Sequence, residues 1–203
     1  METQTDTPGT VAALVLAAGR GIRFGGHKLT ASYRGEPMVR PVLKAVQALR
    51  TTGHVADAIA VVPEADRPLQ DLVHEAGCRV VRQSDPTRGK QDSLARGLGA
   101  LTGHAAALIL LGDQPLVDPE VARRLIEEWR RYPEAIVRPH YEGEPGIPGH
   151  PVVAPARWWR LADAGEPGFS HAELAGAPVW LVPVPGRNPD VDTVADLLAL
   201  EGA

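Results

Sequence analysis

The residues whose types and spacing most clearly suggest a ligand site lie in a glycine-rich segment, residues 16–28, which reads LAAGRGIRFGGHK. The apolar residues 11–16 lead into it and have the character of a buried strand. A strand that ends in a glycine-rich loop leaves backbone N–H groups where an anion can approach closely. Arg20, Arg23 and Lys28 add positive charge to this loop. The combination indicates a site for a polyphosphate.

Three kinds of phosphate-binding loop can be compared with this segment. A Walker loop requires a glycine directly before its lysine and a hydroxyl after it, but His27 precedes Lys28 and no hydroxyl follows. A dinucleotide fingerprint fits Gly19 and Gly21 but has Phe24 at the third glycine position. The third kind is a nucleotidyltransferase loop, in which basic residues hold a triphosphate. A plain glycine-rich turn with solvated arginines is the remaining interpretation.

Two acidic segments supply carboxylates that suit a hard cation. Asp113 follows an apolar run, residues 105–111, which we predict to be a central strand buried on both faces. Mg²⁺ prefers a few carboxylates together with phosphate oxygens and water, so Asp113 is a candidate ligand. A turn cap before Pro115 is the alternative role. Asp190 and Asp192 alternate along an extended stretch and face opposite sides, so only one can readily point at the metal.

Two further segments could contact a ligand. Gly89 would let the backbone approach a flat ligand, and Ser93 with a helix N-terminus would offer donors to a base or a phosphate. A surface turn with an N-cap is the alternative for this segment. Residues 143–152 are rich in proline and glycine and could close over a second substrate. They include His150, which is a candidate contact or, alternatively, a structural histidine.

Hydrophobic periodicity predicts strands and helices that alternate along the chain. We expect strands at residues 11–16, 58–62, 79–82, 105–111, 135–138, 151–153 and 179–184, and helices at 38–50, 67–76, 93–101, 119–132 and 193–200. This alternation is typical of an α/β fold with a mostly parallel sheet. Ligands bind beyond the carboxyl ends of such strands, so the loop after Leu16 and the turn at Asp113 should meet at one edge. Asp192 or Thr193 could instead cap the last helix.

Length and composition limit the class of protein. The 203 residues, 44% of them hydrophobic, suit residues 1–10 as a flexible leader and residues 11–203 as a single domain with a full core. A net charge of −4 and a pI of about 6.0 give no basic footprint for nucleic acid. The single cysteine, Cys78, fits a reducing compartment, and we expect a cytoplasmic location. No apolar run reaches membrane-spanning length, and the leader lacks a signal-peptide pattern.

Taken in order, these segments resemble the molybdenum cofactor nucleotidyltransferases. The sequence LAAGRGIRFG, followed by Lys28, resembles the signature loop of that family, and GDQP at 112–115 resembles its metal-binding turn. GHPV at 149–152 and DVDTVADL at 190–197 resemble its later motifs, and GKQDSL at 89–94 resembles a nucleotide-contacting segment. The resemblance spans about residues 11–200.

The resemblance implies a three-layer, Rossmann-like nucleotidyltransferase fold with a mostly parallel mixed sheet. It also implies transfer of a nucleoside monophosphate from a triphosphate, with release of pyrophosphate. Residues 17–19, Ala-Ala-Gly, are similar to the cytidylyltransferase branch, whereas guanylyltransferases usually show Leu-Ala-Gly-Gly. Gly21, Phe24 and Lys90 depart from the residues common at their positions, and Lys90 leaves the choice of base open.

Site roles follow from the same resemblance. Residues with an implied catalytic role are Arg23, Lys28 and Asp113, and the implied Mg²⁺ ligands are Asp113 and Asp192, with Asp190 as the alternative to Asp192. The implied nucleotide-binding residues are Leu16, Ala17, Ala18, Gly19, Gly21, Arg23, Lys28, Gly89 and Ser93. The implied acceptor-binding residues are Gln114, Gly149 and His150.

The expected function is therefore Mg²⁺-dependent transfer of CMP from CTP to a phosphorylated acceptor, a molybdopterin-type cofactor, with a molybdoenzyme as recipient of the product. No strong general base is required, because a phosphomonoester is largely dianionic at pH 7 and already a nucleophile. One alternative is transfer of GMP or another nucleotide, or use of another acceptor such as a sugar phosphate. A second alternative is a non-catalytic nucleotide- or cofactor-binding protein. Neither nucleic acid nor a membrane is an expected partner.

Overall fold

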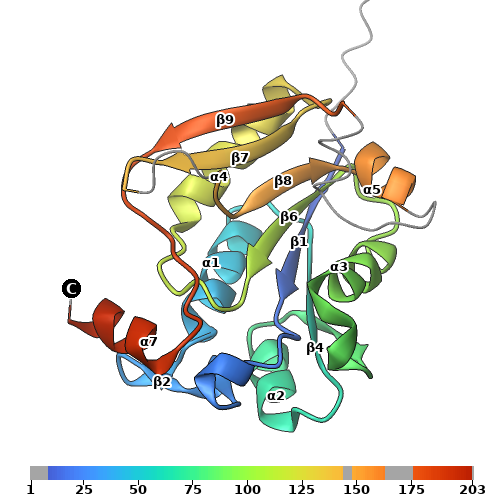
Figure 1. Cartoon of the computed structure of the whole chain (residues 1–203). Coiled ribbons are helices and arrows are strands. Elements are labelled where there is room, and N and C mark those ends of the chain that lie inside the picture. Colours follow the sequence, from blue (N-terminus) through green and yellow to red (C-terminus); the bar gives the residue numbers. More distant parts are fainter. Residues whose placement is uncertain (1–8, 144–147, 163–175, 203) are drawn as a thin grey trace, which may run out of the picture.

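The structure is a computed structural model that describes residues 9–143, 148–162 and 176–202 (Figure 1). Most of the predicted leader and residues 144–147 of the proline- and glycine-rich loop lie outside these ranges. In the described part, one sheet contains seven strands in the order β5-β4-β1-β6-β8-β7-β9. The strands are β1 (Val11–Leu16), β4 (Asp57–Pro63), β5 (Arg79–Gln83), β6 (Ala106–Leu111), β7 (Ile136–Tyr141), β8 (Val152–Pro155) and β9 (Val179–Val184).

The predicted α/β fold with a mostly parallel mixed sheet is confirmed. The pairs β1–β4, β1–β6, β4–β5 and β7–β9 are parallel. Among the seven strands of this sheet in the described part, only β8 runs antiparallel to its neighbours, β6 and β7. Strands β1 and β6 lie side by side near the centre, and all their residues are buried, as near-continuous apolar runs predict.

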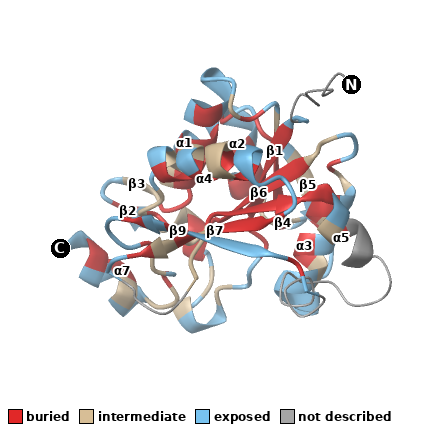
Figure 2. Cartoon of the chain, turned by 90° about the horizontal axis from the view of Figure 1, so that it is seen from above, coloured by how far each residue is buried: buried red, intermediate tan, exposed pale blue. Residues whose placement is uncertain are grey.

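Helices pack on both faces of this sheet through two apolar clusters, one on each face, so the fold has three layers: helices, sheet and helices. Side chains alternate along β1, so Ala13 and Val15 join the larger cluster, whereas Ala12 and Leu14 join the smaller one. The larger cluster includes residues of α1 (Arg40–Thr51), α2 (Arg67–Glu75), α4 (Pro119–Arg131) and α7 (Val194–Glu201). The smaller cluster includes residues of α3 (Gly89–Gly99) and α5 (Ala156–Ala162). Figure 2 shows the buried strands between these helices, with β9 exposed over much of its length.

Helix α3 begins at Gly89, four residues before the predicted start. A short 3-10 turn, Pro86–Arg88, leads directly into it, and Asp92 is an acidic residue in its first turn. Ser93 therefore lies inside the helix, where its Oγ donates a hydrogen bond to the carbonyl of Gly89. The expectation that Ser93 stands at the helix start is wrong.

Other element boundaries also differ from the expected ones. Helix α5 was not predicted, nor was the short antiparallel pair β2 (Ser32–Tyr33) and β3 (Glu36–Pro37). Arg34 and Gly35 turn that hairpin with positive φ angles of 51° and 83°. Strand β7 continues to Tyr141, beyond the predicted end at residue 138, because the parallel ladder with β9 extends through Pro139.

Caps set the starts of two helices close to the expected residues. The Asp118 side chain accepts a hydrogen bond from the Glu120 N–H, and Pro119 is the first residue of α4, as predicted. Thr193 caps α7, and Asp196 completes a capping box with it. Within the described ranges, no helix combines the length and apolar character needed to cross a membrane.

Candidate nucleotide and metal site

The glycine-rich segment forms a tight loop with two 3-10 turns, Ile22–Phe24 and Lys28–Thr30. Gly21, Gly25 and Gly26 have φ angles of 57°, 93° and 93°, a region that residues with side chains adopt at a cost. The carbonyl of Gly21 accepts hydrogen bonds from the N–H groups of Phe24 and Gly26, and these two bonds stabilise the tight turn of the loop. These glycines explain why the sequence forms a loop after β1.

A hollow of about 310 Å³ lies against this loop. One wall is the loop itself, and the other comes from the end of β4 and the start of α2. The lining residues are Ala17, Gly19, Arg20, Gly26, His27, Lys28, Leu29, Pro63, Ala65, Asp66 and Leu69. Three of the predicted nucleotide-contacting residues, Ala17, Gly19 and Lys28, thus face one concave surface at the carboxyl edge of the sheet, together with Arg20 of the same loop.

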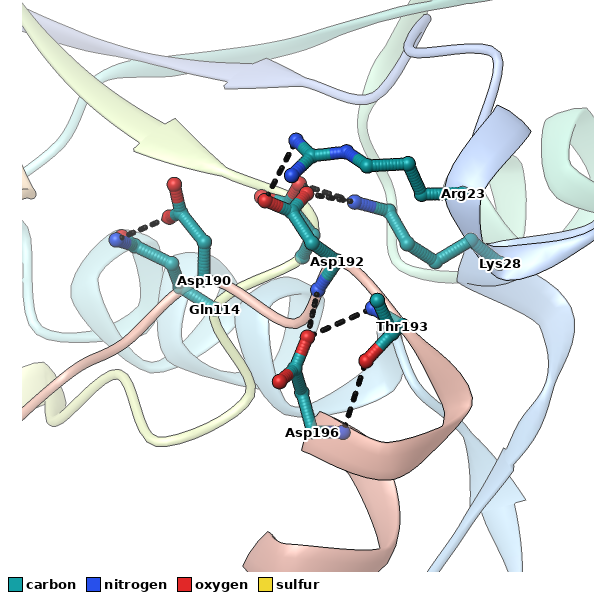
Figure 3. A network of polar contacts seen from close by, with 8 residues as sticks. Arg23, Lys28, Gln114, Asp190, Asp192, Thr193 and Asp196 are labelled. Carbon is teal, nitrogen blue, oxygen red and sulfur yellow. Dashed lines mark hydrogen bonds and ion pairs between the residues drawn. The ribbon is translucent and has the colours of Figure 1, made fainter.

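Lys28 lies between two acidic segments that are far away in the sequence. Its Nζ is 2.6 Å from Asp113 Oδ2 and 3.5 Å from Asp192 Oδ1. Arg23 approaches Asp192 from the other side, with 2.8 Å between Nη2 and Oδ2 (Figure 3). Lys28 is 8% exposed, whereas the Arg23 side chain is 73% exposed. Two cations and two carboxylates therefore form one connected cluster.

Strand register brings the basic loop and the acidic turn together. Leu16 at the end of β1 pairs with Leu111 at the end of β6, so both strands deliver their following residues to the same edge. The Gly112 N–H donates to the Leu16 carbonyl at 2.9 Å, and a Cβ at Gly112 would stand 3.3 Å from that oxygen. Gly112 therefore permits the close approach that places Asp113 beside Lys28. The predicted meeting of the two segments is confirmed.

Asp190 and Asp192 point to different partners, as their alternation predicts. Asp190 Oδ1 accepts a hydrogen bond from Gln114 Nε2 at 2.8 Å, while Asp192 contacts the two cations. The N–H of Val191, between them, donates to the Asp113 carbonyl at 2.9 Å. This bond fixes the acidic stretch against the Asp113 turn and sends its two carboxylates to opposite sides.

The capping box of α7 fixes the backbone of Asp192 and leaves the Asp192 carboxylate out of the capping hydrogen bonds. The Asp196 carboxylate accepts hydrogen bonds from the N–H groups of Asp192 and Thr193, at 3.0 and 2.7 Å (Figure 3). Thr193 takes the capping role that the sequence left open between Thr193 and Asp192. The Asp192 carboxylate is therefore available to cations.

Gln114 and His150, two predicted acceptor-contacting residues, are joined through Asn188. The Asn188 amide donates to Gln114 Oε1 at 3.1 Å and to the His150 carbonyl at 3.3 Å. Tyr141 Oη also donates to that carbonyl, at 2.9 Å. Neither Asn188 nor Tyr141 was predicted as a site residue. Asn188 lies two residues before Asp190, in the acidic segment, so a local signal existed for Asn188 alone. Gly149 is required for packing, because a Cβ there would meet the Tyr141 ring at 2.8 Å.

Burial keeps the His150 ring neutral. The pKa of His150 falls from 6.5 to about 3, first because of burial and then because of the positive charges of Lys90 and Arg138, while a hydrogen bond to the backbone of Ile109 acts in the opposite direction. His150 Nδ1 is buried and has no hydrogen-bond partner among the described residues. At pH 7 the side chain therefore acts as a polar, uncharged group.

The start of α3 lies close enough to influence these groups. Lys90, beside Gly89, lowers the pKa values of both His150 and Asp190. The pKa of Asp190 is nevertheless raised, first by burial and then by the negative charge of Asp113. Gly89 has a φ of 81° at the first turn of the helix, and Ser93 is buried in the second turn beside Gln83. Lys90 is therefore the residue of this segment whose charge acts on His150 and Asp190.

The donor set at the acidic edge fits a divalent cation of the Mg²⁺ type. Asp113 and Asp192 both present carboxylate oxygens to one cation, the Lys28 ammonium. Mg²⁺ is usually held by one or two carboxylates together with phosphate oxygens and water. No group of three histidine, cysteine, aspartate or glutamate side chains forms a closed metal site in the described residues. The arrangement suits a metal that arrives with a phosphorylated ligand.

The fold, one sheet between two layers of helices, is similar to that of a nucleotidyl transferase from Methanothermobacter thermautotroptrophicus, with a TM-score of 0.71. The crystal structure of Rv0371c from Mycobacterium tuberculosis superposes with a TM-score of 0.77 at 26% identity, over 97% of this chain and 100% of that one. A second structure of that protein is its complex with manganese, with a TM-score of 0.74. A family model, the MobA-like NTP transferase domain, matches residues 13–173. The chain belongs to this family.

Two curated relatives carry different names, and each is matched over only part of its length. The bifunctional enzyme IspD/IspF of Rhodospirillum rubrum is 34% identical over 132 residues, which cover 62% of this chain and 33% of that protein. A protein of Thermococcus gammatolerans named "Probable molybdenum cofactor guanylyltransferase" is 30% identical over 131 residues, which cover 63% of this chain and 61% of that protein. The matches thus span about one third and three fifths of these two relatives.

Proposed function

We propose that this protein is a nucleotidyltransferase that moves CMP from CTP to a phosphorylated acceptor and releases pyrophosphate. The observation that carries the proposal is the cluster in which Lys28 and Arg23 meet Asp113 and Asp192 at the carboxyl edge of the sheet. A triphosphate needs cations for its oxygens, and a divalent metal needs carboxylates. The cluster brings both to one place, next to the hollow beside the glycine-rich loop.

The residues have separate tasks in this proposal. Loop N–H groups with Lys28 and Arg23 hold the β- and γ-phosphates and stabilise the charge that develops on pyrophosphate. Asp113 and Asp192 would hold Mg²⁺, which would supply positive charge against the charge of the phosphate oxygens. In this proposal the nucleotide is contacted by Leu16, Ala17, Ala18, Gly19 and Gly21 of the loop, by Gly89 at the start of α3 and by Ser93 in its second turn.

Catalysis in this proposal depends on alignment more than on proton transfer. The acceptor phosphate is largely dianionic near pH 7, so it attacks without a strong base. Gln114, Gly149 and His150 contact the acceptor, and the bonds through Asn188 hold Gln114 and the His150 backbone in a fixed relation. A fixed acceptor phosphate in line with the α-phosphate is the main requirement for the reaction.

The nucleotide and the acceptor are the finer parts of the proposal. Ala18 supports CTP, because guanylyltransferases usually have glycine at this point of the loop. Family membership and the Thermococcus relative support a molybdopterin-type acceptor, from which the product would pass to a molybdoenzyme. The Rhodospirillum relative keeps a different phosphorylated acceptor open as the alternative.

Pyrophosphate release tests the proposal directly. Each of CTP, GTP, ATP and UTP is supplied with Mg²⁺ and either molybdopterin or a sugar phosphate, and pyrophosphate is measured with wild-type protein and Asp113→Asn. We expect the highest turnover with CTP and molybdopterin, and a loss of about 10²-fold in the variant. Preference for GTP or for the sugar phosphate would support the alternative transferase. Binding of nucleotide with no pyrophosphate from any pair would indicate a non-catalytic binding protein.

A further inference from the structure

The two cations of the site occupy the carboxylates that we propose as metal ligands. Lys28 Nζ is 2.6 Å from Asp113 Oδ2, and Arg23 Nη2 is 2.8 Å from Asp192 Oδ2. Lys28 also reaches Asp192 Oδ1 at 3.5 Å. Two positive and two negative charges therefore balance one another before any ligand enters.

A divalent cation alone meets resistance in this arrangement. It would have to bind Asp113 beside an ammonium group that already lies at hydrogen-bond distance from the same oxygen. Lys28 is 8% exposed, and its charge is screened less than that of a surface lysine. Without another anion to take the ammonium, metal binding would leave like charges a few ångströms apart in a partly buried site.

A triphosphate without metal meets the converse resistance. The cations that should receive its oxygens are engaged by carboxylates, and those carboxylates repel the phosphates. Asp190, which accepts a hydrogen bond from Gln114 Nε2 at 2.8 Å, is a third acidic group in the same segment. If both ligands entered together, Lys28 and Arg23 would be free to bind phosphate oxygens, and Asp113 and Asp192 would be free to hold the metal.

We propose that Lys28 and Arg23 are resident counter-cations of the metal carboxylates, so that a divalent cation and the nucleoside triphosphate bind cooperatively. The inference rests on the proposed function for the identity of the two ligands. Each ligand raises the affinity of the other by the same factor, as linkage requires. Couplings of this kind commonly change affinity by about 5- to 150-fold.

Metal binding without nucleotide gives the sharpest test, because a gain of affinity is expected. Mn²⁺ is titrated into the nucleotide-free protein, and free Mn²⁺ is measured by electron paramagnetic resonance. Lys28→Met should bind Mn²⁺ about 10-fold more tightly than wild-type protein. Lys44→Met is the matched control, because Lys44 on α1 forms an exposed ion pair with Glu36 of β3. This control should bind Mn²⁺ as the wild type does.

Two further measurements keep the test decisive if Lys28→Met does not fold. Arg23→Met changes a side chain that is 73% exposed, so it should fold and should also gain Mn²⁺ affinity, by a smaller factor. The converse measurement is the affinity for CTP without metal, determined by calorimetry in the presence of EDTA. Asp113→Asn should bind metal-free CTP more tightly than wild-type protein, because the change releases Lys28 and removes a repelling charge.

Equal Mn²⁺ affinity in wild-type protein and in both folded cation variants would overturn the proposal. So would additive, independent binding of Mn²⁺ and CTP to the wild type. These results are separate from the outcome for the function. Release of pyrophosphate together with independent binding of Mn²⁺ and CTP would support the proposed function and contradict this inference. Cooperative binding without release of pyrophosphate would support this inference and contradict the proposed function.

Discussion

Lys28 Nζ and Asp113 Oδ2 are 2.6 Å apart, although 85 positions separate the two residues in the sequence. The contact exists because β1 and β6 are parallel neighbours with Leu16 opposite Leu111. Both residues follow their strands at the same edge, where α/β proteins bind ligands. Had these side chains been held apart, the basic loop and the acidic turn could not serve one nucleotide.

Asp113→Ala should reduce turnover far more than His150→Ala. Asp113 is bonded to a cation in the centre of the cluster, whereas His150 is a buried neutral ring that contributes through its position. We expect losses of about 10²-fold or more for Asp113→Ala and clearly smaller losses for His150→Ala. Pyrophosphate release at saturating Mg²⁺ measures both. Equal turnover of Asp113→Ala and wild-type protein would refute the assigned role of Asp113.

Asp196→Ala should weaken metal binding although Asp196 does not touch the cations. Its carboxylate accepts hydrogen bonds from the backbone of Asp192 and Thr193, and this fixes the position of Asp192. Loss of such supporting contacts commonly weakens metal binding by about 10- to 100-fold. Mn²⁺ titration in the presence of CTP measures the effect. Thr193→Ser keeps the capping hydroxyl and should bind like the wild type, and a similar loss in this control would contradict the explanation.

Acid should destabilise the protein in part through His150. The pKa is about 3 in the folded protein and about 6.5 in the unfolded chain. Between these values the unfolded chain binds a proton on this ring and the folded protein does not, so the free energy of unfolding falls as the pH falls through that window. Above pH 6.5 both states are neutral and the effect disappears.

Urea unfolding at pH 7.5 and pH 5 checks this sign. The decrease in the free energy of unfolding between the two pH values should be smaller in His150→Gln than in the wild type, because glutamine does not titrate. Asp190, whose pKa is raised by burial, acts in the opposite direction and is present in both proteins. An equal decrease in the two proteins would show that His150 is not a neutral group in the fold.

Gly97→Ala should destabilise the protein, because α3 lies very close to the sheet there. A Cβ at Gly97 would stand 2.4 Å from Leu14 Cδ1 and 3.1 Å from Val61 Cγ2. Overpacking of a well-packed core commonly costs about 1–3 kcal/mol. Gly99, in the same helix, has no atom within 4 Å of an added Cβ. Gly99→Ala should therefore leave the melting temperature unchanged or raise it, and equal loss in both variants would contradict the packing argument.

The local sequence predicted features that depend on neighbouring residues. The apolar runs of β1 and β6 indicated buried parallel strands, because a strand covered on both faces is apolar at nearly every position instead of alternating between polar and apolar residues. Asp118 and Pro119 predicted the start of α4 because capping and the fixed φ of proline act within one turn. The start of α3 was misplaced because the signal at Gly89, a residue with positive φ, was attributed to a loop.

By itself, the sequence determined the α/β class, the order of its motifs and the residue types that could serve a phosphate and a metal. The tertiary structure decided which of these side chains meet. Asp192 rather than Asp190 faces Lys28 and Arg23, and Asn188 joins Gln114 to the His150 backbone. These choices depend on strand register and on hydrogen bonds between segments far apart in the sequence, such as Asn188 to Gln114 with a separation of 74 and Asn188 to His150 with a separation of 38. Periodicity and caps act over a few residues, whereas such contacts form only when the whole sheet is assembled.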